Sequence, residues 1–269
     1  SGIQEKAAFV TKAPRQDSIS GYSYQLSSVL AMLETASQMQ PSGSRLRAYE
    51  QRLLDSCKAM DYPEKMINDS KRYAVAISKR ILAYAKADGY NKISKLPRYT
   101  PLKGDEYWYP TPPAFIAAVE PYFKTVRPFT LDSSAQFKPV PPVSFSADKQ
   151  SAFFKLMEKN YKEALPPDHK AIAAFWDCNP FAVQDNGHLL VALKKISPGA
   201  HWLGIAAIAA EKTKKSFDES MQVYTLVSVG LMDAFICCWD EKYRSNRVRR
   251  ETAIRKFIDP AWVPLLQTP

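Results

Sequence analysis

Residues 237–254 read CCWDEKYRSNRVRRETAI, and five of the nine residues from Lys242 to Arg250 are basic. Lys242 and Arg249 are seven residues apart, close to two turns of a helix, so both side chains can project from one helical face. A compact ammonium and a forked guanidinium together suit the binding of one tetrahedral oxyanion. A solvated helix end, with basic side chains near the helix C-terminus, fits the same residues. The stretch alone leaves both interpretations open.

Working outward, the chain on either side of this stretch has the pattern of an all-helical protein. Patterns that alternate with the period of a strand do not stand out. We therefore predict an all-α helical bundle of about ten helices, with no sheet of consequence. Apolar residues recur at helical spacing in residues 20–39, 46–60, 63–87, 147–164, 168–177, 187–196, 201–215, 217–242 and 247–258.

Three parts are predicted along the 269 residues. Residues 1–95 form the N-terminal helices, and residues 147–269 form the helices of the core bundle that carries the basic stretch. Residues 96–146 are rich in proline and aromatic residues. Proline prevents this segment from being one helix, and its aromatic side chains favour a connector packed on the body over a free linker.

The segment 217–242 contains the most apolar run, MQVYTLVSVGLMDAFICCW at residues 221–239. It is nearly long enough to cross a bilayer. Asp233 lies within it, however, and a carboxylate at that depth favours a central helix of a soluble bundle over a membrane span. The helix is apolar on all sides, so other helices are expected to cover it all round.

Composition and charge exclude several classes of protein. The chain is 46% hydrophobic, which is enough for a large core, and its formal charge of +10 favours acidic ligands. No nucleic-acid-binding module is recognisable, so nucleic acid is not an expected partner. The three histidines and four cysteines have no metal-ligand spacing, and no glycine-rich phosphate loop is present, so we expect no metal site built from them.

Four stretches together resemble the superfamily of soluble vanadium-dependent haloperoxidases and type 2 phosphatidic acid phosphatases. The resemblance covers about residues 96–269, up to a point before the family's Pro-Ser-Gly-His motif, and it implies an all-helical bundle. The stretches are YWYPTPPAFIAAVEPYFKTVRPFTLDSSAQFKPVPP at 107–142, AIAAFWDCNPF with GHLLVALKKISPGAHW at 171–202, the basic stretch itself, and IDPAWVPLLQTP at 258–269.

The resemblance assigns roles to several residues. The family's first oxyanion motif, Lys, six residues, Arg, Pro, maps onto Lys242 and Arg249. Position 250 is Arg250 instead of proline, and without proline we expect the helix to continue and misplace the Arg249 guanidinium. Trp239 is similar to the aromatic residue that lines the pocket beside the lysine. Asp177 is similar to a carboxylate that braces an active-site arginine, although a helix-end acid fits it equally.

The resemblance also implies what else the activity requires. Family members continue past a segment like 262–269 into residues that supply the acid and nucleophilic or metal-ligating histidines. None of His169, His188 and His201 has the sequence context for these roles, so no catalytic residue is assigned. We expect the chain alone to be inactive and to need a second chain or a C-terminal piece that completes the bundle.

The implied function is phosphate ester hydrolysis, as in an acid phosphatase, or halide oxidation with vanadate as cofactor, with a slight preference for the phosphatase. The expected ligand is a phosphate-like or vanadate anion. A catalytically inactive helical interaction module is the alternative, as is a fragment completed by another polypeptide. The expected location is the bacterial periplasm or another extracytoplasmic compartment, with the signal removed, and the cytoplasm stays open.

Overall fold

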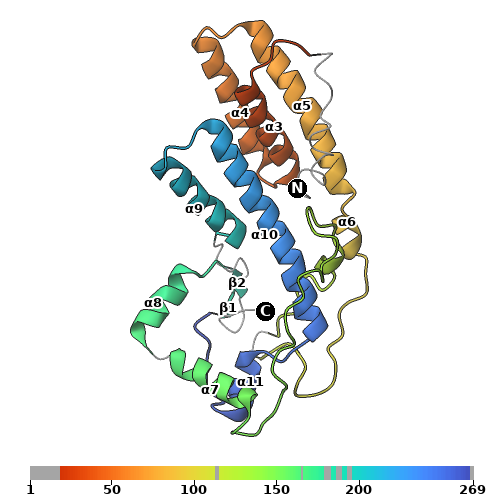
Figure 1. Ribbon diagram of the computed structural model, residues 1–269, viewed down its shortest axis with the longest axis vertical. Helices are drawn as coiled ribbons and strands as arrows, with labels where there is room; N and C mark the ends of the chain where they lie inside the picture. The colour runs from red at the N-terminus through yellow and green to blue at the C-terminus, as the bar shows by residue number, and fades with distance from the viewer. Residues whose placement is uncertain are drawn as a thin grey trace. The chain divides into compact units, whose positions relative to one another are not determined.

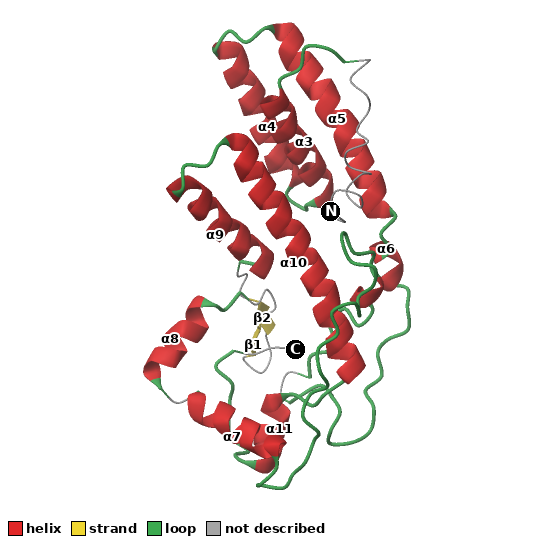
Figure 2. Cartoon of the chain, in the orientation of Figure 1, coloured by secondary structure: helices red, strands yellow, loops and turns green. Residues whose placement is uncertain are grey.

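A computed structural model of the chain describes residues 19–112, 115–164, 166–178, 183–185, 190–192 and 196–266. Most of these residues outside the 96–146 segment are helical, which confirms the all-α class (Figures 1 and 2). The helices are α3 (Tyr24–Met39), α4 (Gly43–Ala59), α5 (Glu64–Lys86), α6 (Tyr90–Ile93), α7 (Ala152–Glu163), α8 (Pro167–Phe175), α9 (Pro198–Lys212), α10 (Phe217–Ser245) and α11 (Arg250–Phe257), with a 3-10 turn, η2 (Phe123–Thr125).

The helix expected at 187–196 is wrong. Within the described residues of that region, β2 (Leu190–Ala192) pairs antiparallel with β1 (Val183–Asp185), and Gln184 lies opposite Val191. A short apolar run fits a buried strand as well as a short helical segment, and the spacing of its apolar residues does not distinguish the two structures. The remaining residues of 187–189 and 193–195 lie outside the described part of the chain.

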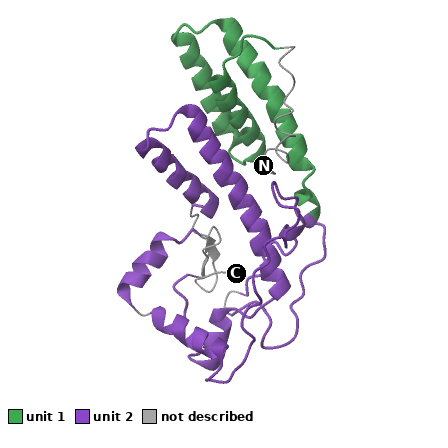
Figure 3. Cartoon of the chain, viewed as in Figure 1, with its two compact units in different colours: residues 1–92 green, residues 93–269 purple. Residues whose placement is uncertain are grey.

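The chain forms two compact units, residues 1–92 and 93–269 (Figure 3). In the first unit α3 packs against α4 and α5. Its apolar core consists of side chains that recur at helical spacing on these three helices: Leu30, Ala31, Leu54, Cys57, Ile67 and Ala74. The three-part division expected from the sequence stays a prediction.

In the second unit α9 and α10 form a helical hairpin, and α7 packs against α11. Helix α10 begins at a capping box in which the Ser216 hydroxyl accepts from the Glu219 backbone and the Glu219 carboxylate accepts from the Ser216 backbone. The core beneath α7 and α11 is built from Phe153, Phe154, Met157, Val248, Ala253 and Ile254. Val248 belongs to the short link between α10 and α11, so this core fixes the link.

The described residues of the 96–146 segment are tied to α10 by polar contacts. The buried Asp233 carboxylate accepts from the amides of Phe129 and Thr130 at 2.7 and 2.8 Å and from the Thr130 hydroxyl at 2.5 Å. Further along α10, the Trp239 indole and the Tyr243 hydroxyl both donate to the Val119 carbonyl. These contacts satisfy polar groups of a loop that has little regular structure of its own.

Helix α10 is the one described helix that is long and apolar enough, by length and composition, to cross a membrane. Only 11% of its most apolar 18-residue stretch is buried. The carboxylate of Asp233 is accommodated in that stretch because it accepts hydrogen bonds from the amides of Phe129 and Thr130. Much of the apolar surface of α10, including Leu226 and Phe235, is therefore exposed in this chain.

Candidate oxyanion site

Helix α10 ends between the two residues of the candidate motif. Ser245 is its last residue, and Asn246 adopts the left-handed conformation with φ 45° and ψ 40°. Asparagine tolerates this conformation better than other residues with a Cβ, and the Tyr99 hydroxyl donates to its side-chain oxygen at 2.6 Å. The expectation that Lys242 and Arg249 project from one continuous helix is therefore wrong.

The link after Asn246 is held in an extended conformation by pairing with residues 106–108. The Trp108 amide donates to the Asn246 carbonyl at 3.0 Å, and the Val248 amide donates to the Glu106 carbonyl at 2.8 Å. Arg249 consequently has φ −69° and ψ 146° and precedes α11. A proline at position 250 would favour these same angles for Arg249. The helix does not continue through Arg250, so that expectation is also wrong.

Lys242 and Arg249 both line one cavity of about 150 Å³, together with Trp108, Val119, Tyr243, Ser245, Asn246 and Arg247. No described residue that lines this cavity carries a carboxylate. The Nε of Arg249 is buried and has no hydrogen-bond partner within the described residues. A buried donor without a partner is costly.

The electrostatics of the cavity favour an anion. Burial lowers the pKa of Lys242, and the nearby positive charge of Arg249 lowers that pKa further. Burial also lowers the pKa of the Arg249 guanidinium, although the charge of Glu251 acts in the opposite direction. Burial raises the pKa of Tyr243 to about 12, so this side chain is a neutral hydroxyl at physiological pH. Two partly buried cations of like charge repel each other, and a bound anion would relieve that repulsion.

Trp239 and Asp177 differ in their relation to the cavity. The Lys242 ammonium lies 4.7 Å from the centre of the Trp239 ring, a distance typical of a cation–π contact. The Trp239 ring also stacks on Phe235, so it gives the lysine a fixed surface. Asp177 follows the end of α8, and it does not line the cavity that Lys242 and Arg249 share.

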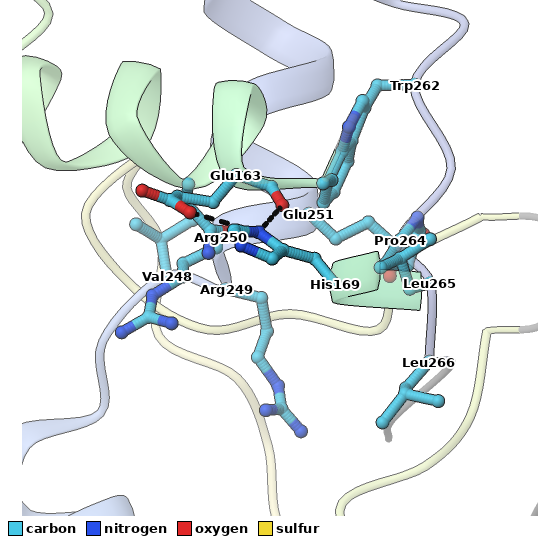
Figure 4. A pocket seen from close by; sticks show the side chains of 12 residues that line it. Glu163, His169, Val248, Arg249, Arg250, Glu251, Trp262, Pro264, Leu265 and Leu266 are labelled. Atoms are coloured by element: carbon cyan, nitrogen blue, oxygen red, sulfur yellow. Dashed lines mark hydrogen bonds and ion pairs between the residues drawn. The ribbon is translucent and has the colours of Figure 1, made fainter. Parts of the chain in front are cut away.

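Arg249 also borders a larger cavity of about 570 Å³, shown in Figure 4. His169, from the first turn of α8, lies within it, and its Nδ1 is 2.9 Å from the Glu163 carbonyl and 3.1 Å from the Glu163 carboxylate. Figure 4 shows the side chains of Arg249 and Arg250 pointing apart. Among the described residues, no three histidine, cysteine or acidic side chains cluster as metal ligands would.

Comparisons with known proteins decide the family. No protein-family model matches the chain, and no functionally curated protein matches it. A solved structure described as the crystal structure of the first bacterial vanadium-dependent iodoperoxidase matches with a TM-score of 0.82 and 35% sequence identity. The match covers 100% of this chain and 68% of that one. The chain belongs to the vanadium-dependent haloperoxidase family. The resemblance inferred from the sequence is thereby confirmed.

In this haloperoxidase-family chain, folding brings residues to the cavities that sequence context did not single out. Asn246 and Trp108 border the smaller cavity, and His169 and Glu163 border the larger one. Asparagine four residues after the motif lysine was a usable signal, because asparagine is common where a helix ends in the left-handed conformation. His169 had no such signal, since only the packing of α8 places it near Arg249.

Proposed function

We propose that this haloperoxidase-family chain binds vanadate between Lys242 and Arg249, as the cationic half of the active site of a vanadium-dependent haloperoxidase. The observation that carries the proposal is that Lys242 and Arg249 line one cavity together and that no described residue lining this cavity carries a carboxylate. The similarity to an iodoperoxidase supports iodide or another halide as substrate over a phosphate ester. Phosphate has the same shape and charge type, so it is expected to compete for the site.

The residues present suit a tetrahedral oxyanion. Lys242 provides a compact charge, and Arg249 provides a fork of donors that matches two oxygens at once. Trp239 limits where the lysine ammonium lies, and the pairing of residues 106–108 with 246–248 fixes the direction of Arg249. When bound, vanadate supplies the centre at which hydrogen peroxide oxidises a halide. The two cations hold its oxygens and stabilise their negative charge in a partly buried, low-dielectric setting.

Replacing Lys242 or Arg249 with alanine is expected to weaken vanadate binding about tenfold or more, because each removes a charge-assisted hydrogen bond. Isothermal titration calorimetry of the 269-residue chain measures the affinity. Lys155→Ala, which removes an exposed cation on α7, is the matched control and should leave the affinity unchanged. Equal losses in all three variants would mean a diffuse basic surface and would contradict the proposal.

The pH dependence gives an independent check on Lys242. Its lowered pKa means that it loses its proton at a lower pH than an ordinary lysine does. Affinity for sulfate, whose charge is constant in alkaline solution, should fall as the pH rises through that lowered pKa. The Lys242→Ala variant should lack this decline, and a decline of equal size in both proteins would point to another group.

We further propose that turnover needs an additional polypeptide segment packed over α8, α9 and α10. The exposure of large apolar side chains there supports this: Ile172, Phe175, Trp176, Trp202, Ile208, Leu226 and Phe235. The iodoperoxidase is longer than the matched region, so its remaining third is the kind of segment that would cover them. Within the described residues His169 is the one histidine bordering either cavity, and it contacts Glu163.

The isolated 269-residue chain is accordingly expected to bind vanadate without catalysing iodide oxidation by hydrogen peroxide or phosphate release from p-nitrophenyl phosphate. Its apolar α10 surface should make it self-associate, so light scattering should give a mass above the 30.3 kDa of one chain. Turnover by the isolated chain would overturn the first expectation, and a monodisperse, cooperatively melting monomer would overturn the second. Neither result bears on vanadate binding itself, which calorimetry measures separately.

A further inference from the structure

A third cavity, of about 350 Å³, lies beside α7 and the link between α10 and α11. Its lining combines three cations with an apolar wall. The residues that line it are Phe153, Leu156, Met157, Lys159, Asn160, Glu163, Arg247, Val248 and Arg250. Lys242 and Arg249, which form the candidate oxyanion site, are not among them, whereas Arg247 lines both cavities.

The three cations of this cavity are Lys159, Arg247 and Arg250, and none of them forms an ion pair with a described carboxylate. Arg247 is held in place, because its Nη2 donates to the Val143 carbonyl at 2.7 Å and its guanidinium lies 5.2 Å from the centre of the Phe153 ring. Burial lowers the pKa of Arg247, and the charge of Arg250 lowers that pKa further. The two guanidinium groups therefore repel each other across a small space.

Glu163 offsets only one of these three positive charges. It is the one carboxylate among the described residues that line the cavity, and its oxygen is 3.1 Å from Nδ1 of His169. Arg250 is directed away from Arg249 (Figure 4), as expected from an extended Arg249 backbone that turns successive side chains to opposite sides. The positive charge of Arg250 therefore belongs to this cavity and not to the site with Lys242.

The apolar wall gives the cavity a second chemical character. Among the residues that line the cavity, Phe153 and Met157 are buried, whereas Leu156 is 53% exposed. An exposed leucine beside unpaired cations suits a ligand that has a charged end and an apolar body. Inorganic phosphate or vanadate would use the cations alone and leave this wall in water.

We propose that this cavity is a separate binding site for an organic carboxylate. Its charged group is held by Arg250, Arg247 and Lys159, and its aryl or alkyl body lies against Leu156 and Met157. The proposal does not depend on vanadate binding between Lys242 and Arg249. Asn160, Glu163, Val248 and Arg250 also line the larger cavity that reaches Arg249, so the bound carboxylate would lie next to the candidate oxyanion site.

The test uses 2-naphthoate, whose intrinsic fluorescence reports binding to the 269-residue chain. We expect Arg250→Gln to weaken binding about tenfold, because it removes a charge-assisted contact. Lys155→Gln is the matched control, since Lys155 lies on α7 one turn before Lys159 and does not line the cavity. Leu156→Asn should also weaken 2-naphthoate binding, and acetate should bind far more weakly than 2-naphthoate. These positions are exposed, so the variants should fold, and melting curves will check this.

Two further measurements separate this site from the candidate oxyanion site. Saturating vanadate should not displace 2-naphthoate, and Lys242→Ala should lose vanadate binding while it retains 2-naphthoate binding. The proposal is overturned if Arg250→Gln binds 2-naphthoate as the unmodified chain does, or if Lys155→Gln loses as much affinity. It is also overturned if Lys242→Ala loses 2-naphthoate and vanadate together, because both ligands would then occupy one site.

Discussion

Replacing Asp233 with alanine is expected to lower the free energy of unfolding by about 3 kcal/mol, because it leaves buried donors without an acceptor. The Asp233 carboxylate accepts hydrogen bonds from the backbone amides of Phe129 and Thr130 and from the Thr130 hydroxyl, and Asp233 is 5% exposed. Alanine supplies none of these acceptors. Urea denaturation monitored by circular dichroism measures the change.

Asp218→Ala is the control for this prediction, because Asp218 lies in the exposed first turn of the same helix. There the carboxylate only complements the helix dipole, so the loss should stay below about 1 kcal/mol. Asp233→Asn should lower the free energy of unfolding by an amount between those of Asp233→Ala and Asp218→Ala, because the asparagine amide keeps one acceptor oxygen. If Asp233→Ala and Asp218→Ala lower the free energy of unfolding equally, the hydrogen bonds between Asp233 and residues 129–130 contribute nothing to stability.

Replacing Asn246 with valine should both destabilise the chain and weaken vanadate binding about tenfold. A β-branched residue in the left-handed conformation costs about 1–2 kcal/mol, and the Tyr99 hydroxyl loses its acceptor at a further cost of about 1–3 kcal/mol. The chain is then expected to leave α10 along another path, which moves Arg249 relative to Lys242. Denaturation and vanadate calorimetry on the same protein measure both effects.

Asn246→Gly separates the backbone effect from the hydrogen bond. Glycine adopts φ 45° without strain but cannot accept from Tyr99, so vanadate affinity should stay within about threefold of the unmodified chain. Tyr99→Phe should behave like Asn246→Gly. If valine and glycine at position 246 weaken vanadate binding equally, the backbone angle at this position does not set the direction of Arg249.

The sequence was informative where helices are long and regular. The segment predicted at 63–87 is α5 (Glu64–Lys86), and the apolar pattern of 217–242 corresponds to most of α10. The end of α10 was predicted three residues early. The strand at 190–192 was predicted as helix, because the apolar period of so short a run does not distinguish a strand from a helix. The η2 turn was not predicted, since it depends on packing of the 96–146 segment against α10.

The candidate site was predictable in its residues and not in its geometry. The Lys242 and Arg249 spacing identified two cations that line one cavity. Their convergence does not come from a shared helical face. It comes from the left-handed backbone at Asn246 and from the pairing of residues 106–108 with 246–248, and no local pattern records a pairing between segments so far apart in the sequence. The place of His169 was not predictable for the same reason, because the packing of α8 puts it beside Glu163 and in a cavity that Arg249 borders.

The extended backbone at Arg249 has an evolutionary consequence. The motif requires a pair of backbone angles, and a proline at position 250 is one way to favour them. Here the pairing of residues 106–108 with 246–248 favours the same angles, so the extended backbone at Arg249 does not require a proline at position 250. A position released in this way can acquire a charge with its own use. In the carboxylate site proposed above, Arg250 would be such a residue, and a search that demands the proline would overlook chains built like this one.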